Sequence, residues 1–185
     1  MYRYRIESAR LKGYDYSRDG AYFITICTKN KSRLFGEIKK YFNDEFVDVD
    51  VDVDVETGLR PVSTSTQPTP QMILSNIGQI VTGCWYDLPN HYPNIILDEF
   101  IVMPDHIHGI IIIRNGSDNK LKHGLSEFIR AFKSFSSRRI NELNKTKISI
   151  WQPRFHDHII RSDNELNRIR LYIKNNPTKF HDCIQ

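Results

Sequence analysis

The alternation of apolar and polar residues predicts a mixed fold in which short strands are separated by helices. Runs rich in β-branched and aromatic residues predict strands, and a pair of such runs interrupted by Pro104 and Asp105 predicts a hairpin. The predicted strands cover residues 21–28, 34–38 (a short strand or turn), the two halves of a hairpin at 95–114, and 151–161.

Apolar residues at helical spacing predict three helices. Ser75 or Asn76 is the expected cap of the first, and Pro89 its expected end. Ser162 or Asp163 is the expected cap of the last, with Glu165 near the capping-box position. The predicted helices cover residues 76–88, 125–143 and 163–175.

This order of elements resembles a split β-α-β arrangement. It predicts an α+β, ferredoxin-like fold with an antiparallel sheet and helices on one face. At 185 residues, the chain is expected to form a single domain over residues 1–185.

Residues 39–71 differ in composition from the sequence around them. Val and Asp alternate strictly from Val47 to Val55, and a segment rich in Pro, Ser and Thr follows. As a strand, this tract would carry four aspartates on one face, where they would repel one another. We therefore expect a solvent-facing ribbon or a disordered loop, inserted into the domain or expanding a hairpin.

The net charge of +4 conceals an asymmetry, because many acidic residues gather in 44–56 and leave the remainder clearly basic. Such a balance favours an anionic partner, nucleic acid first. The three cysteines are few and far apart, which indicates neither a disulfide framework nor a cysteine zinc site and suits a reducing cytoplasm. No apolar run is long enough to cross a membrane.

Basic side chains at three places are candidates for DNA contact. Residues 1–20 interleave cations with tyrosines, as single-stranded nucleic acid binding requires, although the tyrosines could equally fasten a surface arm to the core. The polar side of the helix 125–143 carries several cations that could meet phosphates or simply face solvent. The candidate residues are Arg10, Lys12, Arg130, Lys133, Arg138 and Arg154.

The second strand of the predicted hairpin carries His106 and His108, which alternation places on the same face. Side chains at i and i+2 on a strand are parallel, so the two imidazoles could bind one metal ion. They could equally be a structural pair with hydrogen-bonded ring nitrogens. On the last helix, Tyr172 and Asn176 are four residues apart and are expected to lie one above the other.

Three functions remain open from these residues. The first is phosphoryl transfer, with the His pair and Asn176 holding a metal and Tyr172 acting as nucleophile. The second is a module that binds RNA or DNA without catalysis. The third is a metal hydrolase in which Asp105 or Asp157 supplies an acid, although its spacing matches no hydrolase pattern that we can motivate.

One combination of motifs is more specific than any of these features alone. Met103-Pro-Asp-His-Ile-His-Gly109 is followed, about sixty residues later, by Tyr172-Ile-Lys-Asn-Asn-Pro177. Matching segments extend nearly from end to end and leave out only residues 39–71. They are Ala9-Arg-Leu-Lys-Gly-Tyr-Asp-Tyr16, Gly20-Ala-Tyr-Phe-Ile-Thr-Ile-Cys-Thr28, Leu34-Phe-Gly-Glu37, Phe132-Lys-Ser134, Trp151-Gln152 and His158-Ile-Ile-Arg161.

In these motifs the chain resembles the single-tyrosine HUH transposases, in particular the REP-associated tyrosine transposases. The resemblance implies a ferredoxin-like fold, with His106, His108 and Asn176 as ligands of Mg²⁺ or Mn²⁺. It also implies that Tyr172 forms a 5′-phosphotyrosyl bond to cleaved single-stranded DNA, in a strand that forms hairpins. Transposases of this kind are often dimers, so a homodimer is expected; a domesticated copy that only binds DNA is the alternative.

The chain departs from this family at one place. Many relatives have two tyrosines in the region of Phe155 and His156, and this chain has none. Tyr172 remains the predicted nucleophile because it has an amide residue four positions later. His156 and His158, which share a strand face, are interpreted as structural, with DNA contact as the alternative.

Overall fold

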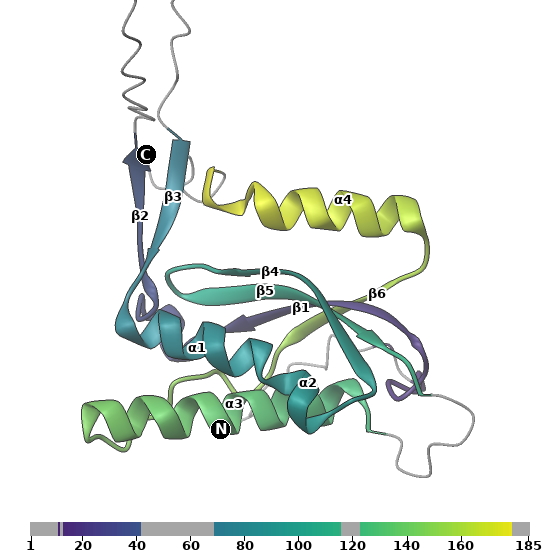
Figure 1. Ribbon diagram of the computed structural model, residues 1–185, viewed down its shortest axis with the longest axis horizontal. Helices are drawn as coiled ribbons and strands as arrows, with labels where there is room; N and C mark the ends of the chain where they lie inside the picture. The colour runs from purple at the N-terminus through teal and green to yellow at the C-terminus, as the bar shows by residue number, and fades with distance from the viewer. Residues whose placement is uncertain (1–10, 12, 42–68, 116–122, 179–185) are drawn as a thin grey trace, which may run out of the picture.

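A computed structural model describes residues 11, 13–41, 69–115 and 123–178 of the chain. Its centre is a four-stranded antiparallel sheet in the order β4-β5-β1-β6 (Figure 1). Read from the β6 edge and numbered along the chain within this sheet, the strands are the fourth, first, third and second, which is the strand order of the predicted ferredoxin-like sheet. The strands are β1 (Gly20–Cys27), β4 (Ile95–Val102), β5 (His106–Ile113) and β6 (His156–Ile160).

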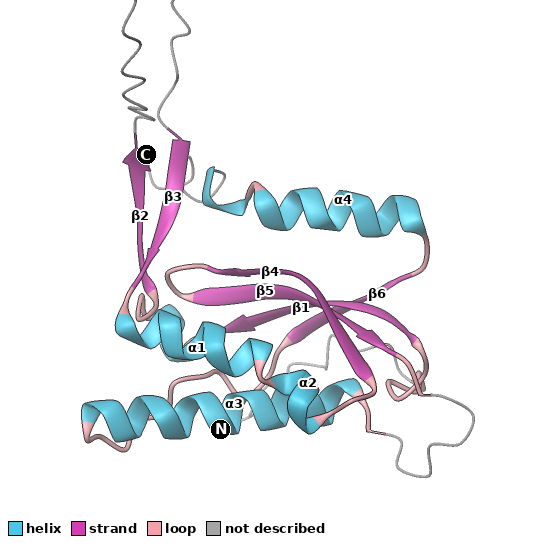
Figure 2. Cartoon of the chain, viewed as in Figure 1, coloured by secondary structure: helices cyan, strands magenta, loops and turns pink. Residues whose placement is uncertain are grey.

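The helices lie on both faces of this sheet (Figure 2). The two crossover helices cover one face, as expected, and the short α2 lies beside them. The terminal helix α4 covers the opposite face, which corrects the expectation that all helices share one side. The helices are α1 (Asn76–Tyr86), α2 (Leu88–His91), α3 (Leu125–Asn144) and α4 (Asp163–Lys174).

The physical reason for this division is that β5 is apolar on both of its sides. Ile107 and Ile111 enter the main core with the crossover helices, whereas Ile110 packs with Ile160 and Ile173 beneath α4. A strand that is apolar on both sides needs a cover on both faces of the sheet. The same alternation places the side chain of His108 on the α4 face.

Gly109, the residue after the second histidine, is in close contact with the aromatic side chains of the main core. Trp85 is fully buried and stacks on Phe100 with their ring centroids 4.6 Å apart. A Cβ atom on Gly109 would lie 2.5 Å from the Trp85 ring. The glycine therefore allows an indole to lie directly against the strand that carries the His pair.

A separate two-stranded ribbon, β2 (Gly36–Tyr41) and β3 (Thr69–Leu74), pairs antiparallel beside the domain. The outer parts of the predicted insertion 39–71 are thus paired strands, which suits the expanded hairpin. Residues 42–68 lie outside the described part of the chain, and the Val-Asp tract lies within them.

The helix caps agree with the sequence at both ends of the domain. Ser75 accepts a hydrogen bond from the Gly78 amide, and Ser162 accepts one from the Glu165 amide. Contrary to the prediction, Pro89 does not end the first helix, because α1 already ends at Tyr86. Because proline is suited to the first turn of a helix, it lies instead in the first turn of α2.

Two ion pairs fasten α4 to the edge strand β4. The Arg170 guanidinium donates to both carboxylate oxygens of Asp98, with distances of 2.9 and 2.5 Å. The Lys174 ammonium lies 2.9 Å from a Glu99 oxygen. These contacts orient the helix that carries Tyr172.

Candidate active site

The two histidines predicted as metal ligands lie on the α4 face of the sheet, in transverse rows set by strand register. His106 is opposite Cys27 of β1, and His108 is opposite Thr25, which is opposite His156 of β6. Directly opposed residues of antiparallel strands point to the same face. The sheet therefore brings residues from three strands to one surface beneath α4.

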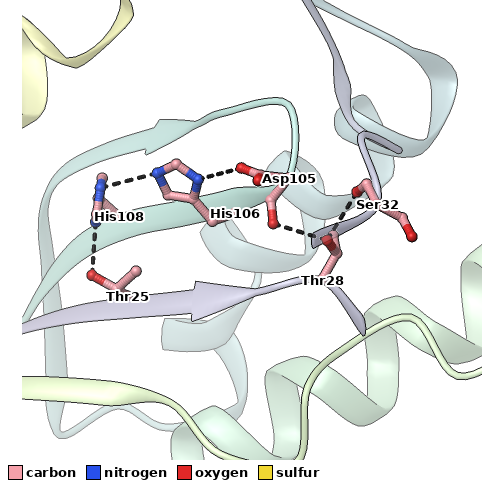
Figure 3. Close-up of polar contacts among 6 residues, drawn as sticks. All are labelled: Thr25, Thr28, Ser32, Asp105, His106 and His108. Atoms are coloured by element: carbon pink, nitrogen blue, oxygen red, sulfur yellow. Dashed lines mark hydrogen bonds and ion pairs between the residues drawn. The ribbon is translucent and has the colours of Figure 1, made fainter. Parts of the chain in front are cut away.

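The two imidazoles face each other through their Nε2 atoms, which are 3.1 Å apart (Figure 3). The Nδ1 atom of each ring makes a hydrogen bond on the side away from the other ring. His106 Nδ1 lies 2.6 Å from a carboxylate oxygen of Asp105, and His108 Nδ1 lies 2.8 Å from the Thr25 hydroxyl. Ligand histidines in metal sites are oriented in this way.

The turn before the His pair is itself fixed by the backbone. Thr28 donates from both its amide and its hydroxyl to the Asp105 carbonyl, each at 2.9 Å. The Met103 amide donates to the His106 carbonyl at 2.8 Å. The Asp105 carboxylate is thus carried on a rigid turn, which fixes the ring of His106.

Hydrogen bonding decides which nitrogen of each ring is available. An ionised Asp105 only accepts, so neutral His106 carries its proton on Nδ1 and leaves a lone pair on Nε2. Burial, and next the charge of His106, lower the pKa of His108 to about 3, so this ring is neutral at physiological pH. The Thr25 hydroxyl can donate or accept, which allows either tautomer of His108.

The His pair fits a divalent metal ion. Two nitrogen ligands at right angles and about 2.1 Å from one ion lie about 3 Å apart, close to the observed separation. Two facing lone pairs repel unless a cation or a proton lies between them. Within the described residues, no group of three or more His, Cys, Asp or Glu side chains is placed to hold a metal, so a third protein ligand has to be of another type.

Tyr172 lies against one member of this pair, His108. Its ring centroid is 5.4 Å from that of His108 and 6.0 Å from that of Phe23, edge-on to the latter. Phe23 in turn stacks on His108 at 5.3 Å. Tyr172 is 38% exposed, so part of its side chain is accessible from solvent.

Asn176 lies just beyond the helix that carries the tyrosine. α4 ends at Lys174 with Asn175 as its C-cap, and Asn176 begins a further helical turn after this break. Its side chain is buried, at 6% exposed. Burial of an amide at this position, close in sequence to Tyr172, is compatible with its predicted role as a ligand.

A pocket of about 610 Å³ opens beside Tyr172, between α4 and strands β1 and β6. Here the Nε2–H group of His158 of β6 donates to the Glu165 carboxylate of α4 at 2.7 Å, which supports its structural interpretation. The pocket is lined by Phe23, His158, Glu165, Arg168, Ile169, Leu171, Tyr172 and Asn175.

The predicted DNA-contacting cations do not gather at this site. Arg130, Lys133 and Arg138 belong to α3, on the far face of the sheet. The Lys133 ammonium donates to the carbonyls of Gln152 and Arg154, at 2.8 and 3.0 Å, and so holds the loop before β6. The Arg154 side chain is exposed, while Arg10 and Lys12 lie outside the described residues.

Sequence reasoning missed several residues of this site. Thr25 was not singled out, and Asp105 was considered only as the acid of a hydrolase. The alternation of β1 places Phe23 and Thr25 on one face, but it does not say which strand lies next to them. Only the register brings Thr25 to His108 and Phe23 to His158.

Comparison with known proteins agrees with this geometry. The sequence profile described as "Transposase IS200 like" matches residues 88–176, which include the His pair, Tyr172 and Asn176. An uncharacterized protein of Haemophilus influenzae is 32% identical over 92% of this chain and 87% of its own length. A putative REP-associated tyrosine transposase of the same organism is 33% identical over 48% of this chain and 52% of its own length.

A solved structure shares the fold. It is a REP-associated tyrosine transposase bound to a REP hairpin, and it aligns with a TM-score of 0.56 and 19% identity over 92% of this chain and 74% of that one. Residues 88–176, just under half of the chain, thus match the model of the IS200-like transposase family. Together with the relative named a putative REP-associated tyrosine transposase, this match supports a transposase-like role in DNA processing. No helix in the described part of the chain is long and apolar enough to span a membrane.

Proposed function

We propose that this protein is a metal-dependent endonuclease and strand transferase that cleaves and rejoins single-stranded DNA through a 5′-phosphotyrosine at Tyr172. The observation that carries the proposal is the facing pair of imidazoles, 3.1 Å apart at Nε2, beneath the ring of Tyr172. A structural pair of histidines would not require a partly exposed tyrosine at the same place.

His106 and His108 are the proposed protein ligands of Mg²⁺ or Mn²⁺. Both ions prefer oxygen ligands, so the Asn176 side-chain oxygen, a DNA phosphate and water would complete the set. An ion held by these residues would supply polarisation of the phosphate and would offset the charge that develops on it. Asp105 and Thr25 keep the two rings in the orientation that this requires.

Tyr172 performs the covalent step. Its phenol oxygen forms a bond to phosphorus, and the bond from phosphorus to the 3′ oxygen breaks. The phenol loses its proton, and the departing oxygen gains one to become a 3′-hydroxyl. Attack by a hydroxyl on the phosphotyrosine reverses the step and joins strands.

The natural substrate class is single-stranded DNA able to form a hairpin. This follows from the family and from the hairpin bound by the structural relative, and we extend it to this chain as part of the proposal. A homodimer, expected from the resemblance, stays a prediction that light scattering of the purified protein would test.

The decisive experiment incubates the protein with a library of single-stranded hairpins and Mn²⁺, then isolates and sequences any DNA that remains attached under denaturing conditions. Wild type is expected to form adducts, and Tyr172→Phe to form none while its thermal transition changes little. His106→Ala is expected to lose metal-dependent cleavage.

Three outcomes would contradict the proposal. Adducts that persist in Tyr172→Phe would remove the tyrosine from its assigned role, and full activity of His106→Ala would return the His pair to a structural one. Hairpin binding without cleavage by wild type in Mn²⁺ would favour the non-catalytic binding protein instead.

A further inference from the structure

The pocket beside Tyr172 has no assigned part in phosphoryl transfer. Its volume of about 610 Å³ lies within the range of pockets that hold small organic molecules. Its walls combine aromatic and aliphatic side chains, Phe23, Ile169 and Leu171, with the polar groups of His158, Arg168 and Asn175. Leu171 is 61% exposed, so its apolar side chain is accessible to a ligand in the pocket.

We propose that this pocket binds the nucleobase next to the scissile phosphate and thereby selects the nucleotide at which the strand is cut. The inference rests on the proposed function, because it takes Tyr172 to be the residue that meets the phosphate. It adds a base-binding site to the proposed function. It also gives a role in sequence specificity to pocket residues that take no part in phosphoryl transfer.

The position of Phe23 supports this inference. Its ring stacks on that of His108 and also contacts that of Tyr172 in a T-shaped arrangement, and it lines the pocket. Phe23 is thus a common wall between the site of chemistry and the pocket. A strand whose phosphate lies between Tyr172 and the His pair has an adjoining nucleotide at the pocket mouth.

The chemistry of the lining suits a base. Base faces bind to aromatic and apolar surfaces, and base edges need hydrogen-bond donors and acceptors around them. Asn175 is exposed, and its side-chain amide offers a hydrogen-bond donor and a hydrogen-bond acceptor. At the mouth, Arg168 is 79% exposed and lies 3.8 Å from Glu165, so its charge is free to turn toward a phosphate.

The polar wall is organised before any ligand binds. The Glu165 carboxylate contacts His158 through one oxygen, at 2.7 Å, and accepts from the Arg161 amide through the other, at 2.9 Å. This bond ties α4 to β6 and fixes the spacing of the two walls. A base entering between them would therefore meet a preformed slot, which lowers the ordering cost of binding.

The first test measures binding without catalysis. The four deoxynucleoside monophosphates are titrated, up to about 10 mM, into isotope-labelled protein, and backbone amide shifts are followed by NMR. We expect shifts at Phe23, Ile169 and Asn175 with at least one of the four. Leu171→Trp, which fills the pocket from an exposed position, should weaken this binding about tenfold.

Asn164→Trp is the matched control, because it places the same side chain on an exposed part of α4 outside the pocket. It should bind as wild type does. Absence of shifts at the pocket, or equal affinity in the two tryptophan variants, would overturn the proposal.

The second test reads the sequence of DNA. Covalent adducts formed from the hairpin library are sequenced together with the released strands, for wild type and for Asn175→Ala. We expect the base preference at one position adjoining the cut to change about tenfold, with the tyrosine and its adduct retained. Unchanged preference at both adjoining positions means that the pocket does not select the base.

The two tests separate failure of the pocket from failure of the proposed function. If wild type forms no adduct, the catalytic proposal fails, and the NMR titration still decides whether the pocket binds a base. If adducts form but neither test responds to the pocket variants, the catalytic proposal stands and the base site is wrong.

Discussion

The two faces of the central sheet are built in opposite ways. Toward α1 and α3, the core contains large side chains that are fully buried, among them Tyr22, Trp85, Phe128 and Phe132. Toward α4, the buried apolar residues are Ile110, Ile160 and Ile173. Around them lie partly buried apolar residues, among them Phe23, Leu166 and Ile169, and the polar row of His108, Thr25 and His156.

This difference has a physical explanation. A thick apolar layer stabilises the fold but would leave no route for water, metal or phosphate to the His pair. A thin layer, supplemented by ion pairs at the helix edge, holds α4 in place and leaves its tyrosine partly exposed. One face therefore supplies most of the stability, and the other supplies access.

The largest contrast should come from truncating one buried residue on each face. Phe132→Ala is expected to cost about 3–5 kcal/mol in the free energy of unfolding, and Ile173→Ala about 2–3 kcal/mol. Chemical denaturation measures both. Equal costs would contradict the unequal division of stability between the faces.

The same pair of variants should show the reverse order in function. Ile173 is the neighbour of Tyr172 and anchors its helix, so Ile173→Ala should reduce adduct formation at a temperature where both variants are folded. If Phe132→Ala reduced adduct formation more than Ile173→Ala under these conditions, the α4 face would not be the face that supports catalysis.

Gly109→Val tests how tightly the main core lies against the His strand. The new side chain would collide with Trp85, whose ring already lies 2.5 Å from the position of a Cβ atom. Overpacking of this kind is expected to cost about 1–3 kcal/mol, seen as a lower denaturation midpoint. Gly83→Val is a control for β-branching, because a Cβ at that helical position meets nothing within 4 Å.

Thr25→Val removes the hydroxyl that faces His108 Nδ1 and keeps the shape of the side chain. Loss of such a supporting hydrogen bond typically weakens metal binding about 10- to 100-fold. Titration of Mn²⁺, followed by calorimetry, measures this change. Wild-type affinity in Thr25→Val would show that the hydroxyl does not orient the ring.

The smallest effect concerns the ion pair that fastens α4. The hydrogen bonds from Arg170 lower the pKa of Asp98 below its ordinary value of 3.8. A carboxyl whose pKa is lowered by folding stabilises the native state above pH 3.8, and this contribution is lost as the pH falls through the lowered value.

Asp98→Asn should therefore be less stable than wild type at neutral pH, and the difference should shrink below about pH 3.8. Thermal unfolding of both proteins across this range is the measurement. A difference that does not change with pH would mean that the pair contributes through packing and not through charge.

Much of the secondary structure follows from local pattern. Alternation located β1 and the central hairpin, helical spacing located α3, and Ser75 and Ser162 cap their helices as expected. Pro89 was misplaced because proline both ends one helix and suits the first turn of the next, and local sequence does not distinguish the two.

Cations were harder to interpret than apolar residues. Lys133 was assigned to DNA from its position on a polar helix face, yet its ammonium donates to carbonyls of the loop before β6. A charged side chain on a surface is compatible with solvent, an ion pair, a loop or a ligand. Composition alone cannot choose between them.

The sequence by itself determined that His106 and His108 share a strand face, because side chains on a strand repeat every two residues. Together with the motif at Tyr172, it also indicated the family whose model matches residues 88–176. Tertiary structure alone decided the rest of the site: that Thr25 supports His108, that Phe23 joins the tyrosine to a pocket, and that α4 crosses the face opposite the main core. The physical reason is that periodicity specifies the face of a residue within its own strand, whereas neighbours across strands depend on a register set by the packing of the whole chain.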